Sequence, residues 1–189
     1  MEARLARSTE QLATEAEEWT HADLIALWRR IQSGERIAGW GRGKVFEYLV
    51  IRAFQLEGAV IRWPFQVSYP QRFGTMEQHD GFVYVRDRAF LIESKATAEA
   101  PGIEAVAKLR FRLEARPPGT MGLLFSVATF SEPTEVFTQF ASPLNVLLWT
   151  GKDVDLALRT GRMRSGLEQK LRFANEFGLS NYSFVRSQP

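Results

Sequence analysis

Phe90-Leu91-Ile92-Glu93-Ser94-Lys95 is an apolar run that ends in an acid and a lysine two residues apart. The apolar residues 89–92 predict a strand that enters a hydrophobic core. Because side chains alternate along a strand, we expect Glu93 and Lys95 to point to the same side of it. The sequence thus places two opposite charges at the end of a buried strand, which is an unusual place for charged side chains.

The preceding residues supply a third charged group. Residues 81–85 are rich in aromatic and β-branched side chains, and the polar residues 86–88 connect them to Phe90, which predicts a β-hairpin. Pairing around this turn brings Asp80 close to Ser94 and Lys95. Two carboxylates then offer the hard oxygen ligands that Mg²⁺ prefers. A lysine beside them can orient a metal-bound water or offset charge on a transferring phosphate.

Alternating helices and strands follow the hairpin. Val106, Leu109 and Leu113 have helical spacing, so a helix from Ile103 should pack on the sheet. The other face of this helix carries Lys108, Arg110, Arg112 and Arg116, either as a solvated face or as a track for a nucleic-acid backbone. The nearly continuous apolar run 119–128 is typical of an interior strand, a further helix starts at Ser131, and residues 144–149 form the next strand. This order predicts an α/β protein, a three-layer α/β/α sandwich with a central mixed sheet.

Helices are also expected before the hairpin and at both ends of the chain. Thr20 and Asp23 form a capping-box pattern at the start of one helix, and residues 44–56 form another whose apolar stripe includes Glu47 at its edge. A phosphate-loop interpretation of residues 39–44 fails because Val45 stands where that loop needs Ser or Thr. Residues 69–78 are polar and are expected to form a loop over the proposed site. We therefore expect a helical N-terminal extension (1–38), a core domain (39–160) and a helical C-terminal extension (161–189).

Asp80 followed by Glu93-Ser94-Lys95 after a hairpin resembles the motif of the PD-(D/E)xK nuclease superfamily, with His79 where that family often has proline. Residues 119–126 with Phe130-Ser131, and residues 145–151 with the segment 153–156, resemble the Mrr-like branch of restriction endonucleases. The resemblance covers roughly residues 39–158 and implies a restriction-endonuclease-like fold.

The resemblance also implies an activity and roles for named residues. It implies a Mg²⁺-dependent endodeoxyribonuclease, with Mn²⁺ as a substitute ion, that hydrolyses phosphodiester bonds in DNA during restriction, defence or repair. Asp80, Glu93 and the carbonyl of Ser94 would hold the metal, and Lys95 would position the attacking water. Glu47 is the position that resembles the assisting glutamate of that family; its alternative interpretation is a solvated residue at the edge of the helix stripe.

Composition excludes several other classes of protein. The 189 residues, 45% hydrophobic and 24% charged, fit one soluble domain with extensions. The absence of cysteine excludes disulfides and cysteine-ligated zinc. No apolar run is long enough for a membrane span or a signal peptide, so we expect a cytoplasmic protein that does not contact a membrane.

Two alternatives to a nuclease stay open. The net charge of only +2 and the missing proline favour a catalytically inactive nucleic-acid-binding or scaffolding domain of the same fold. Alternatively, Glu93 and Lys95 form a structural ion pair in a protein that is not a nuclease. Cutting both DNA strands needs two active sites, which favours a homodimer, or a nuclease subunit within a larger defence assembly.

Overall fold

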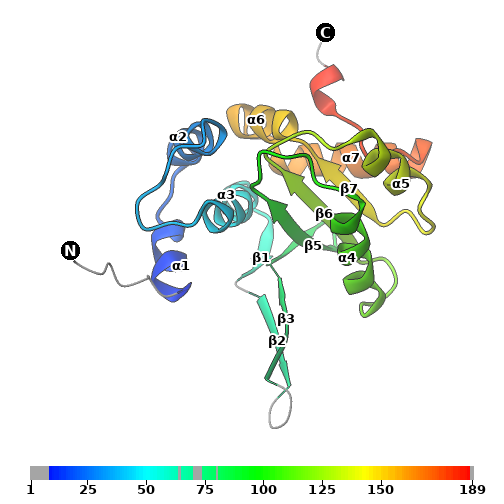
Figure 1. Ribbon diagram of the computed structural model, residues 1–189, viewed down its shortest axis with the longest axis horizontal. Coiled ribbons are helices and arrows are strands. Elements are labelled where there is room, and N and C mark those ends of the chain that lie inside the picture. Colours follow the sequence, from blue (N-terminus) through cyan, green and yellow to red (C-terminus); the bar gives the residue numbers. More distant parts are fainter. Residues whose placement is uncertain (1–8, 64, 70–73, 80, 188–189) are drawn as a thin grey trace.

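A five-stranded mixed sheet with helices on both faces forms the body of the protein, as the computed structural model shows (Figure 1). The structure describes residues 9–63, 65–69, 74–79 and 81–187. The strands lie side by side in the order β1 (Val60–Arg62), β4 (Gly81–Val85), β5 (Arg88–Lys95), β6 (Met121–Ser126) and β7 (Val146–Trp149). β1, β4 and β5 pair antiparallel, whereas β5, β6 and β7 pair parallel, so β5 is the central strand where the two patterns meet.

Alternating side chains divide the core into two parts, one on each face of the sheet. Phe90 and Ile92 of β5 pack with α3 (Arg42–Leu56), α6 (Gly151–Thr160) and α7 (Met163–Phe177). Leu91 points to the other face and packs under α4 (Ile103–Glu114), beside which lies α5 (Glu132–Phe140). The predicted three-layer α/β/α sandwich with a mixed sheet is therefore confirmed. None of the helices that the structure describes is long and apolar enough to cross a membrane.

A two-residue turn fixes the register of the β4–β5 hairpin. Arg86 and Asp87 both have positive φ angles, 48° and 60°, as a type I′ turn requires. Val85 therefore pairs with Arg88, and Gly81 pairs with Ile92 at the other end of the hairpin. The predicted hairpin is confirmed, and its register places the start of β4 beside the residue that precedes Glu93.

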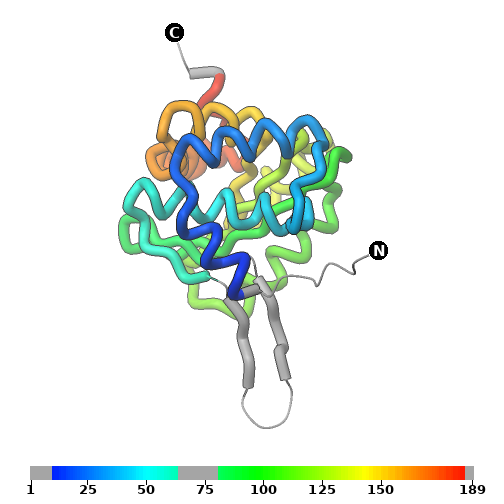
Figure 2. The backbone as a smooth tube through the Cα atoms, turned by 90° about the vertical axis from the view of Figure 1, so that its left-hand side faces the viewer, coloured from blue at the N-terminus to red at the C-terminus, as the bar shows by residue number. Residues whose placement is uncertain are grey.

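The N-terminal helices α1 (Thr9–Glu17) and α2 (His21–Gln32) pack against α3 and share its core (Figure 2). The predicted capping box is present, because Thr20 and Asp23 bond reciprocally at the start of α2. Trp28 of α2 is 1% exposed, stacks on Phe46 with ring centres 5.6 Å apart, and donates to Asp155 through its indole nitrogen. These contacts hold α2 firmly against the body of the protein.

A buried ion pair ties the C-terminal residues to the same core. Lys170 of α7 is fully buried, and its ammonium group donates to Asp153 Oδ2 at 3.0 Å and to the carbonyl of Leu148 at 2.9 Å. Asp153 also accepts from Ser183 Oγ at 2.6 Å, just before the short 3₁₀ helix η1 (Phe184–Ser187). Burial lowers the pKa of Lys170, and the charge of Asp153 opposes that shift. The start of α6, the middle of α7 and the end of β7 thus meet at one polar cluster inside an apolar core.

The outer strand β7 is bonded to the C-terminal segment. Its Leu148 N–H donates to the carbonyl of Ser180 at 2.9 Å, and its Leu148 carbonyl accepts from Lys170. Ser180 after α7 and Lys170 within α7 therefore occupy backbone groups that an edge strand otherwise leaves open.

The orientation of α5 is the reverse of an ordinary amphipathic helix. Thr134 and Thr138 are buried and bond to the carbonyls of Pro101 and Thr134, respectively. Phe140, in contrast, is 81% exposed, and Val136 and Phe137 also face outward.

The expectation of a polar loop at residues 69–78 is wrong for residues 69 and 74–78, and residues 70–73 lie outside the described residues. The chain instead forms a second, two-stranded antiparallel sheet from β2 (Phe65–Tyr69) and β3 (Gly74–His79), which are separate from the main sheet (Figure 1). Backbone hydrogen bonds along the two strands hold this sheet together, and such bonds do not require an apolar sequence.

Candidate active site

Glu93 and Lys95 lie near the carboxyl end of β5 and point to the α4 face of the sheet. The alternation that turns Leu91 toward α4 also turns Glu93 and Lys95 that way. Glu93 is only 8% exposed, and Lys95 Nζ lies 2.7 Å from Glu93 Oε1. The predicted pairing of these two side chains on one side of the strand is therefore confirmed.

Arg112 of α4 is a third member of this cluster, and the sequence did not single it out. Its guanidinium donates to Glu93 Oε2, the carboxylate oxygen that Lys95 does not contact. The side chain of Arg112 is 15% exposed, so it belongs neither to a fully solvated face nor to an open track for a nucleic-acid backbone. Both oxygens of Glu93 thus accept a charge-assisted hydrogen bond.

The two cations keep Glu93 ionised despite its burial. Burial raises the pKa of a carboxyl group because it penalises the charged form. Here this effect is outweighed by the hydrogen bond and charge of Lys95 and by the charge and hydrogen bond of Arg112, which together hold the pKa of Glu93 below its ordinary value. The cluster therefore presents a buried, negatively charged carboxylate at neutral pH.

Glu47 lies in the other helical layer. It is 6% exposed on α3, and Lys44 Nζ lies 3.0 Å and 2.8 Å from its two carboxylate oxygens. α3 covers the face of the sheet opposite to α4, the helix whose Arg112 contacts Glu93. Burial, together with the charge of Glu47, raises the pKa of the neighbouring Tyr48 to about 12. The structure thus pairs each glutamate with its own cation, and the sequence did not identify Lys44 as the partner of Glu47.

Of the other two predicted metal ligands, the structure describes Ser94 but not Asp80. Asp80 lies outside the described residues; its neighbour Gly81 pairs with Ile92, which adjoins Glu93. Ser94 lies between Glu93 and Lys95 in β5 and is opposite Phe125 in the parallel pairing with β6. Within the described part of the chain, no three acidic, histidine or cysteine side chains gather closely enough to hold a metal ion.

The cluster of Glu93, Lys95 and Arg112 can bind both a cation and an anion. An ionised carboxylate offers hard oxygen ligands to a divalent cation, and an ammonium and a guanidinium beside it can bind a phosphate oxygen or stabilise negative charge. The same three groups can also form a purely structural ion-pair cluster, in which two cations satisfy one buried carboxylate.

Comparisons with known proteins find similarity only to solved structures, and that similarity is weak. No protein-family model and no curated protein matches the sequence. A solved structure described as the MspJI restriction endonuclease in complex with a 27-mer oligonucleotide is similar, with 19% identity and a TM-score of 0.45 over 97% of this chain and 41% of that one. The DNA modification-dependent restriction endonuclease AspBHI is also similar, with 19% identity and a TM-score of 0.44 over 91% of this chain and 44% of that one. The chain thus spans less than half the length of either protein.

Proposed function

We propose that this chain is a metal-dependent endonuclease that hydrolyses phosphodiester bonds in DNA. The observation that carries the proposal is the buried Glu93 at the end of the central strand, with Lys95 at 2.7 Å and its pKa held low. A carboxylate whose pKa is shifted by burial and by specific charged partners is a candidate for a functional site.

The donor chemistry of these residues fits a hard divalent cation. The carboxylates of Asp80 and Glu93 and the carbonyl of Ser94 would hold Mg²⁺, with Mn²⁺ as a substitute. When bound, the ion supplies Lewis-acid stabilisation of the phosphate and lowers the pKa of a bound water. All of these ligands are oxygen atoms, which Mg²⁺ prefers. Glu93 is already ionised at neutral pH, so it needs no deprotonation before it binds a cation.

The side chains around the carboxylate have distinct proposed roles. Lys95 holds the attacking water in line with the phosphorus and offsets negative charge that develops on the phosphate. Arg112 fixes the orientation of Glu93 through its second oxygen. Glu47 stays a proposed assisting group, although its place in the α3 layer with Lys44 makes it the least direct participant.

Plasmid cleavage tests this proposal. Purified protein is incubated with supercoiled plasmid and Mg²⁺ or Mn²⁺, beside the variants Lys95→Ala and Asp80→Ala and an EDTA control. Arg172→Ala serves as the matched control, because Arg172 is an exposed cation on α7 whose side chain is 70% accessible. We expect nicking or linearisation by the wild type and by Arg172→Ala, and its loss in the two site variants and in EDTA. Cleavage that persists in EDTA or in Asp80→Ala contradicts the proposal.

A catalytically inactive, nucleic-acid-binding or scaffolding domain is the second candidate. The observation that favours it is that both oxygens of Glu93 already have cationic partners within the chain, so the carboxylate is occupied by Lys95 and Arg112. This reading predicts DNA binding that Glu93→Gln leaves unchanged and no cleavage with any metal ion. A gel-shift titration run beside the plasmid assay separates the two functions.

Two cooperating copies would complete a double-strand cut. One chain offers one proposed site, so a homodimer or a partner subunit is needed for cutting both strands together. Light scattering measures the mass in solution; a strict monomer that only nicks plasmid contradicts the homodimer, and linearisation by a dimer supports it.

A further inference from the structure

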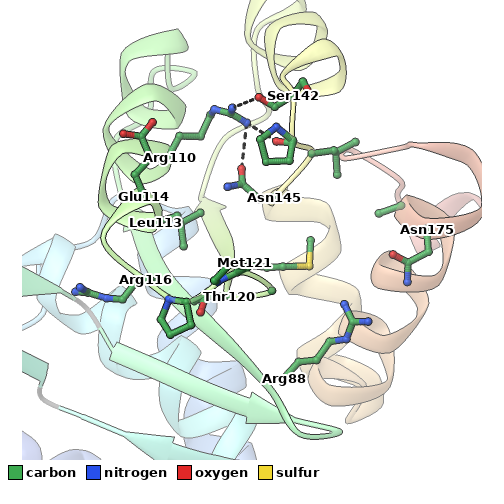
Figure 3. Close-up of a pocket in the computed structure, with 16 residues that line it drawn as sticks. Arg88, Arg110, Leu113, Glu114, Arg116, Thr120, Met121, Ser142, Asn145 and Asn175 are labelled. Carbon is green, nitrogen blue, oxygen red and sulfur yellow. Dashed lines mark hydrogen bonds between the residues drawn. The ribbon is translucent and has the colours of Figure 1, made fainter.

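A cleft of about 560 Å³ lies at the edge of the sheet opposite to the Glu93 cluster (Figure 3). Its floor is where β5, β6 and β7 begin, at Arg88, Met121 and Asn145, the residue just before β7. Its sides are the end of α4 and the last turn of α7. Arg88 and Lys95 stand at opposite ends of β5, roughly 23 Å apart along the strand. The cleft is thus separate from the proposed active site.

Positive charge dominates the lining of the cleft. Arg88, Arg110 and Arg116 line it, against a single acidic residue, Glu114. Three arginines and one carboxylate give a formal charge of +2 in a space of nucleotide size. Such a concentration of guanidinium groups around one space favours an anionic ligand.

Arg110 is held rigidly in the wall of the cleft. Its guanidinium donates to the carbonyls of Ser142 and Pro143 at 2.9 Å and 2.7 Å, and to Asn145 Oδ1 at 3.0 Å (Figure 3). The bond to Asn145 fixes the amide of that residue, which leaves the Asn145 NH₂ group as a donor on a preorganised wall. Preorganisation of this kind reduces the entropy cost of binding.

Arg88 is the cation that a ligand can engage most directly. Its side chain is exposed, and its guanidinium makes no hydrogen bond or ion pair with any residue that the structure describes. Figure 3 shows it turned toward the side of the cleft where Asn175 lies. A solvated arginine with five available donors needs little rearrangement to bind phosphate bidentately.

The rest of the lining is apolar and suits the body of an organic anion rather than a bare ion. Leu113, Met121 and Leu144 line the cleft beside three prolines. Binding sites for small molecules commonly combine such apolar walls with a few fixed polar groups. Amide groups from Asn145 and Asn175 can bond to ring nitrogens and carbonyls of a base.

We propose that this cleft binds a phosphate monoester carried on a nucleotide-sized body, with Arg88 on the phosphate and the apolar wall against the base or sugar. This small-molecule site does not rest on the proposed nuclease activity. It assigns a ligand to the edge of the sheet that the cleavage chemistry does not use.

Calorimetric titration of the full chain in EDTA tests the proposal. The probes are deoxyadenosine 5′-monophosphate, deoxyadenosine and inorganic phosphate, each added to wild type, Arg88→Gln, Arg172→Gln and Lys95→Ala. We expect saturable binding of the monophosphate, weaker binding of deoxyadenosine and of phosphate alone, and a loss of roughly 10- to 100-fold in affinity in Arg88→Gln. Arg172→Gln, which removes an exposed cation elsewhere on α7, and Lys95→Ala should both bind like the wild type.

Three results would overturn the proposal. One is the absence of monophosphate binding to a correctly folded wild type. Another is equal affinity for deoxyadenosine and its monophosphate, which would show that the phosphate does not contribute to binding. The third is binding that Lys95→Ala abolishes and Arg88→Gln leaves intact, because the nucleotide would then occupy the Glu93 cluster. This last result leaves the nuclease proposal standing, so the two proposals fail separately.

Discussion

Replacing Arg112 by methionine should destabilise the protein at neutral pH and leave it little changed in acid. Methionine replaces the aliphatic part of the arginine side chain but offers no donor, so Glu93 Oε2 loses its charge-assisted hydrogen bond while Oε1 keeps Lys95. The second variant, Arg112→Gln, keeps a neutral donor and tests how much of the effect needs the charge.

The magnitude follows from the burial of Glu93 and its two partners. Removing a hydrogen bond to a charged group that is 8% exposed costs about 1.5–3 kcal/mol, and the remaining bond to Lys95 favours a value near 2 kcal/mol. For a chain of 189 residues this corresponds to a decrease of about 4–8 °C in melting temperature. Arg112→Gln should lose about half as much, because neutral hydrogen bonds are about half as strong.

The pH dependence has a definite sign. The pKa of Glu93 is lowered in the folded protein, so its ionised form stabilises the fold above the ordinary value of 4.5. That stabilisation is lost as the pH falls through the lower, folded-state pKa. The difference in unfolding free energy between wild type and Arg112→Met should therefore be full near neutral pH and shrink as the pH falls below about 4.5.

Urea unfolding at several pH values, monitored by tryptophan fluorescence, measures the effect. The double variant Arg112→Met with Glu93→Gln completes a thermodynamic cycle that isolates the pair. If Arg112→Met costs as much with glutamine at position 93 as with glutamate, Arg112 acts through packing alone, and the electrostatic account of the cluster is wrong.

Further predictions concern the effect of three substitutions on the stability of the protein. Lys170→Met should lose about 3–5 kcal/mol in urea unfolding, because it leaves the fully buried Asp153 without its cation; a loss below about 1 kcal/mol would contradict this account of the pair. Gly151→Ala should cost more than about 2 kcal/mol, since a Cβ there would lie 2.0 Å from the carbonyl oxygen of Val127, and a melting temperature within a degree of wild type would contradict that close approach. Gly43→Ala is its matched control: no atom lies within 4 Å of a Cβ at this helical position, so thermal unfolding should show a gain of about 0.5–1 kcal/mol, and a loss would mean that α3 starts later than described.

Local sequence patterns were sufficient to predict most of the sandwich. The run before Glu93 and the polar turn at residues 86–87 define a hairpin, and the apolar spacing from Val106 to Leu113 defines the helix that covers it. These features depend on neighbours a few residues away, where strand and helix periods act directly. The pairing of β2 with β3 escaped prediction although Phe65, Val67 and Tyr69 alternate with polar residues in β2, because β3 has no matching apolar alternation.

Local sequence patterns also predict only part of the candidate site, because they describe neighbours along the chain and not contacts between distant elements. The strand period fixes Lys95 beside Glu93. Arg112 comes from α4, and nothing in its local pattern distinguishes it from Arg110, which faces the opposite edge of the sheet and bonds to the loop before β7. Which arginine reaches the carboxylate depends on how α4 lies across the strands, and only the tertiary structure contains that information.

Because the C-terminal segment bonds to Leu148, the two outer strands of the main sheet, β1 and β7, differ in how easily a strand from another chain can pair with them. At β7 the Leu148 N–H and carbonyl are occupied by Ser180 and Lys170, so a foreign strand must first displace them. At the opposite edge, β1 presents Val60 at 67% exposure and has β4 as its only strand neighbour in the described sheet. Within the main sheet, strand addition by another chain is thus directed to the β1 side, and removal of the residues after α7 would free the Leu148 N–H while leaving the Leu148 carbonyl bonded to Lys170.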